Sequence, residues 1–200
     1  MELVVVRHGR TQWNAHSRFQ GQTDVPLDDV GRAQARALAD RLRDDPFDAA
    51  VASDLSRARE TAEIILAGRG VPLVLDERWR EGRFGAWEGL TWDEILARHP
   101  EIRREDAVRP SAYAPPGGEA FGALRARVAA ALDDLLARTD PGARVLIATH
   151  AGPLHALLDV ALGERSAPRV RFTPASVTRL RLDGHAGAAL VSLNESIAGG

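Results

Sequence analysis

Four short, mostly apolar segments mark the predicted core of the chain. They cover residues 3–6, 47–52, 71–75 and 143–149, and the first is an unbroken run of leucine and valine. Segments of this length and composition are typical of strands buried in a parallel sheet. Two later segments, 176–182 and 188–193, alternate apolar and polar residues instead, and they predict a closing pair of strands.

Segments with apolar residues at helical spacing separate these strands. We predict helices over residues 28–42, from residue 54 onward, and over 91–98, 119–138 and 151–162. Asp28 is a candidate N-cap, and Thr91 with Glu94 forms a capping-box pattern. This order predicts an α/β protein, a three-layer α/β/α sandwich with a mostly parallel central sheet. We expect one domain over residues 1–200, with a small cap or insertion around residues 90–120.

Candidate catalytic and phosphate-binding residues follow three of the predicted strands. Arg7, His8 and Gly9 follow the first strand, and His150 follows the strand at 143–149. Because ligands of open α/β sheets bind beyond the carboxyl ends of the strands, we expect both histidines at one crevice. Arg57 falls just inside the helix after the second strand, where a helix start and a cation together favour an anion.

Each of these residues, taken alone, also has a structural interpretation. His8 and His150 fit hydrogen-bonded core histidines, and an isolated arginine such as Arg57 is usually a solvated surface charge. His150 and His155 are five positions apart, which does not place two ligands on one helix face. We therefore predict no metal site.

The overall composition limits the partners. Apolar residues make up 44% of the chain and charged residues 27%, as in ordinary globular proteins, and the formal net charge is −2. We therefore expect neither nucleic acid nor a membrane as a partner. No apolar run is long enough to span a bilayer, and residues 1–7 lack the features of a signal peptide. The expected location is the cytoplasm.

Two absent residue types limit the chemistry. The chain has no cysteine, which excludes disulfides and thiolate chemistry, and all 26 of its cationic side chains are arginine. Schiff-base catalysis and a Walker-type phosphate loop both need a lysine and are therefore excluded. Codon usage in a GC-rich genome is the favoured explanation of the arginine bias, although arginine also binds phosphate bidentately. His, Ser, Thr, Asp and Glu remain as possible nucleophiles.

Taken together, the segments resemble the histidine phosphatase superfamily, also called the phosphoglycerate mutase-like superfamily. The resemblance runs from residue 4 to about residue 194, and its layout is most similar to broad-specificity bacterial phosphatases and ribazole-phosphate phosphatases. It rests on an ordered set of short pieces: Arg7-His8-Gly9 with Thr11 and Asn14, Phe19-Gln20-Gly21 with Asp24, Pro26-Leu27, Gly31, the segment 53–62, Glu81, Phe84-Gly85, Trp87-Glu88-Gly89 and Thr149-His150.

The resemblance implies a role for each catalytic residue. His8 attacks phosphorus and carries the phosphoryl group covalently. Arg7, Arg57 and His150 surround the phosphoryl oxygens and neutralise the charge that spreads over them in the transition state. Glu81 is the general acid and then the general base, a role that requires a raised pKa.

Further residues are expected to border the phosphate. Asn14 donates a hydrogen bond, Gln20 and the backbone of Gly21 border the pocket, and the amides at the helix start near Ala151 face the oxygens. Desolvation is expected to raise the pKa of Glu81, in a loop that carries Trp79, Phe84 and Trp87. No cofactor is expected.

Three functions fit this resemblance. A metal-independent phosphatase acting on a small phosphorylated metabolite is favoured, because the glycolytic mutases of the family are longer after the Glu81 region and segment 91–118 is brief here. The alternative is phosphoglycerate mutase-type phosphoryl transfer, an isomerase reaction that needs a lid to exclude water. An inactive phosphate-binding module would lack His8, an arginine or Glu81, and all are present.

Substrate and assembly are less determined. Arg10 stands where members of the family usually have an acidic or amide residue, and it is either a cation at the pocket mouth or a solvent-facing side chain. Arg83 stands where the family often has an acidic residue. A monomer and a homodimer both fit. Six further side chains are candidates for the leaving-group side of the pocket, although packing in the cap or the core is the commoner role for each: Trp13, Phe19, Arg104, Arg109, Tyr113 and Phe121.

Overall fold

The computed structural model describes residues 1–100, 102, 114–168, 170–183 and 187–197. Within these residues one sheet has six strands in the order β3-β2-β4-β1-β5-β6. Neighbouring strands among β1 to β4 are parallel, and β5 and β6 are antiparallel to their neighbours. The predicted α/β class with a mostly parallel sheet is confirmed. The strands are β1 (Glu2–Arg7), β2 (Ala49–Ala52), β3 (Leu73–Leu75), β4 (Arg144–Thr149), β5 (Val177–Leu182) and β6 (Ala188–Glu195).

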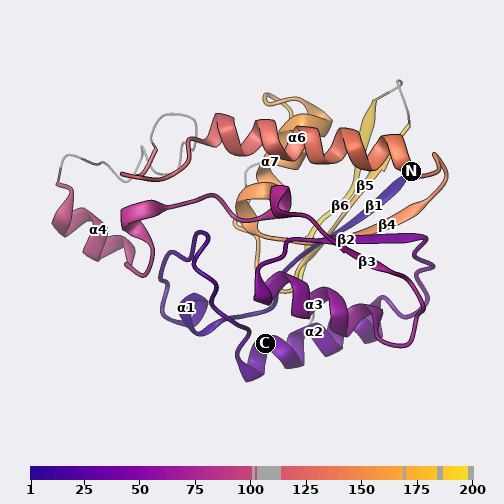
Figure 1. The fold of residues 1–200 in the computed structure, drawn as a ribbon, viewed down its shortest axis with the longest axis horizontal. Helices are drawn as coiled ribbons and strands as arrows, with labels where there is room; N and C mark the ends of the chain where they lie inside the picture. Colours follow the sequence, from indigo (N-terminus) through magenta and orange to yellow (C-terminus); the bar gives the residue numbers. More distant parts are fainter. Residues whose placement is uncertain (101, 103–113, 169, 184–186, 198–200) are drawn as a thin grey trace.

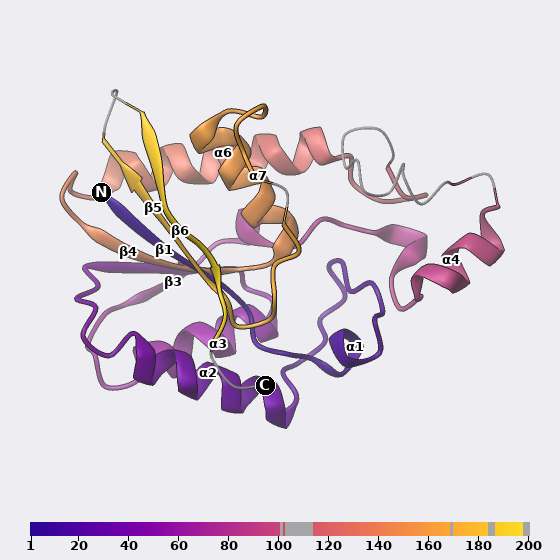
Figure 2. The same ribbon diagram turned by 180° about the vertical axis from the view of Figure 1, so that it is seen from behind.

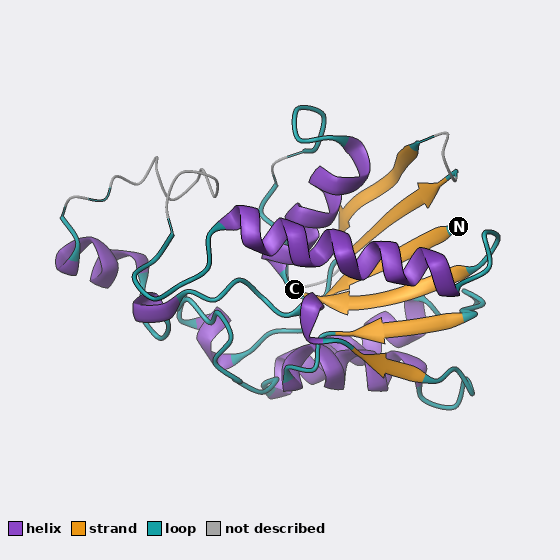
Figure 3. Ribbon diagram, turned by 45° about the horizontal axis from the view of Figure 1, so that its top comes forward, coloured by secondary structure: helices purple, strands orange, loops and turns teal. Residues whose placement is uncertain are grey.

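Helices cover both faces of this sheet and make three layers (Figures 1 and 2). α6 (Phe121–Arg138) and α7 (Ala151–Leu162) lie on one face, and α2 (Asp29–Arg41) and α3 (Ser56–Leu66) lie on the other. Figure 3 shows the strands side by side with α6 across them. Two shorter helices lie beyond the carboxyl end of β1 (Figure 1): α1 (Gln12–Ala15), which the sequence analysis did not predict, and α4 (Trp92–Arg98).

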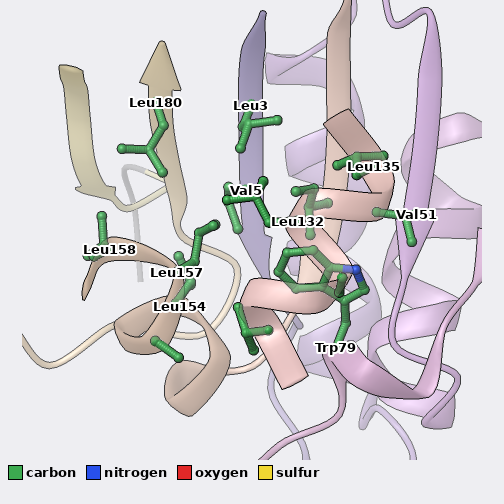
Figure 4. Packing of buried hydrophobic residues seen from close by; sticks show 14 of the residues in the cluster. Leu3, Val5, Val51, Trp79, Leu132, Leu135, Leu154, Leu157, Leu158 and Leu180 are labelled. Atoms are coloured by element: carbon green, nitrogen blue, oxygen red, sulfur yellow. The ribbon is translucent and has the colours of Figure 1, made fainter. Parts of the chain in front are cut away.

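The packing of β1 explains its unbroken apolar run. Leu3 and Val5 are completely buried in the cluster formed with α6 and α7, whereas Val4 and Val6 are buried in the cluster formed with α2 and α3. Figure 4 shows Val5 beside Leu132 of α6. Because successive side chains point to opposite faces, a strand covered on both sides has no position for a polar residue.

The start of α3 differs from the prediction. The sequence predicts a helix from residue 54, but α3 begins at Ser56, and its N-cap residue Leu55 provides no side-chain acceptor. Instead, the N–H and the hydroxyl of Ser56 both donate to Asp24 Oδ1, at 2.8 and 2.7 Å. A carboxylate from a distant loop therefore caps the helix, which a rule based on local sequence cannot foresee.

The predicted capping box of α4 is present. Thr91 Oγ1 accepts from the Glu94 N–H at 3.3 Å, and Glu94 Oε2 accepts from the Thr91 N–H at 2.7 Å. The expected cap at 90–120 includes residues 101 and 103–113, which lie outside the described residues, so the cap stays a prediction. In the described ranges, no helix is long and apolar enough to cross a membrane. A separate apolar cluster packs around α4: Trp87, Leu90, Ile95 and Ile102.

Candidate active site

A cleft of about 330 Å³ lies where β1 ends. Its walls come from widely separated parts of the chain, and every predicted site residue except His150 lines it. The lining residues are Arg7, His8, Asn14, Ser17, Arg18, Phe19, Gln20, Gly21, Arg57, Glu81, Phe84, Ala151 and Arg171.

The register of two parallel strands brings His8 and His150 together. Arg7 of β1 is paired with Thr149 of β4, so the next residue of each strand leaves the sheet at the same level. The His8 N–H donates to the Thr149 carbonyl at 2.9 Å, and the two imidazole centroids are 5.0 Å apart. The two histidines are therefore neighbours, as their position at strand ends predicts.

His8 has the protonation pattern of a nucleophile. Its Nδ1 lies 2.7 Å from the carbonyl oxygen of Gly9. Because a carbonyl oxygen only accepts, Nδ1 carries the hydrogen and Nε2 keeps the lone pair. Burial, together with the charges of Arg57 and Arg7, holds the pKa of His8 well below its usual range. The ring is therefore neutral at physiological pH, with Nε2 as its nucleophilic nitrogen.

Arg57 is a fully buried cation held by the protein backbone. Its Nη2 donates to the Gly21 carbonyl at 2.7 Å, its Nη1 to the Thr23 carbonyl at 2.9 Å, and its Nε to His150 Nδ1 at 3.2 Å. Burial lowers the pKa of Arg57 to about 10, so it stays charged at neutral pH. No carboxylate of the described residues contacts it, and its two remaining N–H donors are free for an anion.

Arg7 supplies a second cation to the cleft. Its Nη1 donates to the carbonyl of Phe172, whereas its buried Nε has no acceptor among the described residues. Burial lowers the pKa of Arg7 to about 10, with Glu81 opposing the shift and Arg171 and Arg57 adding to it. A buried N–H without a partner costs free energy, so this donor is suited to a ligand.

Glu81 is a buried carboxyl group that the start of α7 supports. Its Oε1 accepts the N–H of Gly82 at 2.9 Å and the N–H of Gly152 at 3.0 Å. A Cβ atom at position 152 would lie 2.2 Å from that oxygen, so the contact requires glycine. Burial raises the pKa of Glu81, against the lowering effect of the Gly82 hydrogen bond, Arg57, Arg7 and the Gly152 hydrogen bond. The direction is the one that a general acid needs.

Arg127 of α6 fixes the loop that carries Glu81. Its Nη1 donates to the carbonyls of Arg78 and Arg80, both at 2.7 Å, and its Nη2 donates to the carbonyl of Glu81 at 2.9 Å. Glu119 neutralises it at 2.8 Å. Arg127 is not among the predicted site residues, because nothing in the local sequence distinguishes it from the other arginines of the same helix.

Thr11 orients the two amide side chains predicted to bind phosphate. The Asn14 Oδ1 accepts the Thr11 N–H at 3.1 Å, and the Gln20 Oε1 accepts the Thr11 hydroxyl at 3.0 Å. Both amide oxygens are therefore occupied. In the described part of the chain, neither side-chain NH₂ group donates to a protein atom, so both are available to a ligand in the cleft.

Glu88 joins the Gly21 turn to the Glu81 loop. It accepts the N–H groups of Gln22, Thr23 and Phe84 at 3.2, 3.0 and 3.0 Å. Gly21 has a φ of 54°, and a Cβ there would lie 2.1 Å from Glu88 Oε1. A glycine is therefore needed both for the turn and for this close approach.

His150 is the one predicted site residue that does not line the cleft. It is fully buried at the N-cap of α7, and its Nδ1 accepts from Arg57, so its Nε2 carries the hydrogen and donates to Ser53 Oγ at 2.9 Å. Burial, with Arg57 and His8, lowers its pKa well below the usual range. In this arrangement His150 positions Arg57, and its direct contact with phosphate stays a prediction. Ala151 presents the start of α7 to the cleft.

Three polar lining residues were not foreseen: Ser17, Arg18 and Arg171. Arg18 is neutralised by Glu94 at 2.8 Å. Arg171 is exposed, and its side chain makes no hydrogen bond or ion pair within the described residues. No local motif distinguishes it in the sequence.

The other positions weighed for specificity have different surroundings. Arg10 is paired with Asp28 at 2.8 Å and does not line the cleft, and Arg83 lines a separate hollow. Phe19 lines the cleft, whereas Trp13 does not. Phe121 packs against the main core, and Arg104, Arg109 and Tyr113 lie outside the described residues.

Residues 3–196 match the family model of the histidine phosphatase superfamily (branch 1). The chain belongs to this superfamily. A probable phosphoglycerate mutase GpmB of Yersinia pestis is 34% identical over 182 residues, which cover 90% of this chain and 84% of that protein.

Solved structures are similar over nearly the whole chain. A mycobacterial glucosyl-3-phosphoglycerate phosphatase, solved with VO₃, has a TM-score of 0.86 and 33% identity, with 98% of this chain and 99% of that chain covered. The alpha-ribazole phosphatase of Shigella flexneri has a TM-score of 0.83 and 27% identity, with 98% and 96% covered. The names of these relatives include both phosphatases and a mutase, so the chain is a phosphatase or a mutase of this superfamily.

Proposed function

We propose that the protein is a metal-independent phosphatase that hydrolyses small phosphomonoesters through a phosphohistidine on His8. One observation carries this proposal. A neutral histidine with its Nε2 lone pair free lines the same cleft as two charged arginines and a buried carboxyl group of raised pKa. These are a nucleophile, an anion site and a general acid.

In the first step, His8 Nε2 attacks phosphorus and forms the N–P bond while the P–O ester bond breaks. Glu81 transfers its proton to the leaving oxygen, so the alcohol departs neutral. Arg57 and the unpartnered Nε of Arg7 face the charge on the phosphoryl oxygens. The Gly9 carbonyl accepts the His8 Nδ1 hydrogen throughout and keeps the ring oriented.

In the second step, water replaces the alcohol. The Glu81 carboxylate takes a proton from the water as its oxygen attacks phosphorus, and the N–P bond breaks to release inorganic phosphate and neutral His8. Exposed residues, Ser17 and Arg171, lie on the cleft wall, so water has a route to the phosphohistidine. The similarity to two phosphatases over almost their whole length supports the hydrolase.

The second candidate is a phosphoglycerate mutase-type transfer, which the similarity to the Yersinia protein favours. It would use the same first step and then pass the phosphoryl group to a second bound hydroxyl. Exclusion of water by a lid separates the two reactions.

Phosphate release from para-nitrophenyl phosphate in EDTA tests the proposal, with wild type compared with His8→Ala. We expect release by the wild type and none by the variant, and an acid-labile phosphoryl group trapped on the wild type alone. Equal release by both proteins would overturn the role of His8. No release by the wild type, with interconversion of phosphoglycerates in the presence of a bisphosphate primer, would establish the mutase instead.

A further inference from the structure

The cleft holds one more positive charge than a simple phosphate ester requires. Among the described residues, four arginines line it: Arg7, Arg18, Arg57 and Arg171. Arg18 is neutralised by Glu94. A phosphomonoester dianion balances Arg7 and Arg57, and the general acid enters the first step in its neutral form. The charge of Arg171 therefore remains without a counterpart in the described part of the chain.

The backbone of Arg171 is held in place, although its side chain has no partner among the residues that the structure describes. Its carbonyl accepts from Asn194 Nδ2 at 3.2 Å, and the Thr173 N–H donates to Asn194 Oδ1 at 2.9 Å. Phe172 between them is buried, and its carbonyl accepts from Arg7. The structure therefore keeps this cation at the cleft wall next to the residue that anchors a phosphate-binding arginine.

We infer that Arg171 binds a second anionic group, a carboxylate or a phosphate, on the leaving-group part of the substrate. The inference rests on the proposed function and narrows its substrate class to phosphomonoesters with a further negative charge. A guanidinium pairs bidentately with either group, and Arg7 and Arg57 already provide donors for the phosphoryl oxygens. Because this contact is remote from the bonds that change, it acts equally on the bound substrate and the transition state, and it sets KM.

Paired substrates test this role. For wild type and Arg171→Gln we would compare 3-phosphoglycerate with glycerol 3-phosphate, which lacks the carboxylate, and glucose 1,6-bisphosphate with glucose 6-phosphate. In the variant we expect KM to rise about 10- to 100-fold for the doubly anionic substrate of one pair, with kcat nearly unchanged. The KM for the singly anionic substrate of that pair should stay within about twofold of the wild-type value. The responding pair identifies the carboxylate or the phosphate.

Controls separate this role from the proposed function. Arg181→Gln removes an exposed arginine of β5 outside the cleft, and it should leave KM unchanged for both substrates of each pair. Arg171→Lys should recover part of the lost affinity. An equal change for both members of each pair, or no change, would overturn the inference. Calorimetry can measure the affinity of His8→Ala for 3-phosphoglycerate and for glycerol 3-phosphate, with and without Arg171→Gln. This binding measurement tests the contact even if the protein proves not to be a hydrolase.

Discussion

At the floor of the cleft, Arg57 and Glu81 are buried and hydrogen-bonded to backbone groups, whereas at the rim Ser17 and Arg171 are exposed. The floor is built where parallel strands end and where α7 begins, so the sheet fixes its geometry. The rim residues lie outside the helices and strands: Ser17 follows α1, and Arg171 lies between α7 and β5. Under the proposed function, we expect the floor to determine the chemistry and the rim to select the alcohol that leaves.

The two regions also differ in how much each residue depends on the others. Arg57 donates to two backbone carbonyls and to His150, so its replacement disturbs several partners. Arg171 has no side-chain partner within the described residues and can be replaced without such an effect. Substitutions at the floor should therefore change turnover and stability together, and substitutions at the rim should change KM alone.

Arg57→Ala should have the largest effect. It removes a buried cation from the phosphoryl site and leaves the carbonyls of Gly21 and Thr23 without their donor. We expect a loss of about 10³-fold or more in kcat/KM and a destabilisation of about 2–4 kcal/mol. Kinetics and urea unfolding measure the two effects. Arg57→Lys should recover little activity, because an ammonium group cannot span these acceptors. Full activity in either variant would contradict the assignment.

Glu81→Gln should lower kcat/KM by about 10²-fold or more for alkyl phosphates and far less for aryl phosphates, whose leaving groups need no proton. In the wild type the general acid must be protonated, so activity should fall as pH rises through the raised pKa of Glu81, and the variant should lack this limb. The exposed Glu77→Gln is the matched control. Equal losses on both ester classes would count against general acid catalysis.

The same pKa shift predicts an effect on stability. Because the folded pKa of Glu81 is raised, its contribution to stability is fully present below the unfolded pKa and is lost as pH rises through the folded pKa. Glu81→Gln should therefore gain thermal stability relative to the wild type at alkaline pH, and the difference should shrink in acid.

Arg127→Met should have a smaller effect through the position of Glu81. The variant keeps the alkyl stem but frees the carbonyls of Arg78, Arg80 and Glu81. We expect about a tenfold loss of kcat/KM on alkyl phosphates, since small misplacements of a catalytic group are costly, with kcat/KM on aryl phosphates nearly unaffected. Arg125→Gln, an exposed neighbour on α6, should match the wild type. Equal losses on both ester classes would indicate a structural role alone.

The sequence predicted the floor far better than the rim, for physical reasons. His8 and His150 follow buried strands whose apolar runs are visible, and parallel register brings strand ends together. The cap on α3 from Asp24 and the hold of Arg127 on the Glu81 loop depend on contacts between distant segments. Such contacts leave no periodic pattern, and an arginine in a loop looks the same whether it is paired or free.

Arg10 and Arg171 test most directly whether a paired arginine and a free one, which look alike in the sequence, differ in function. The Arg10 substitution has the smallest expected effect. The sequence leaves Arg10 as either a cation at the pocket mouth or a solvent-facing side chain; in the structure it is bound to Asp28 at 2.8 Å and does not line the cleft. Arg10→Gln should leave KM for 3-phosphoglycerate within about twofold and cost at most about 1 kcal/mol of stability, because the ion pair is partly exposed. A rise in KM matching that of Arg171→Gln would mean that Arg10 releases Asp28 when substrate binds, and that the rim is rearranged by its ligand.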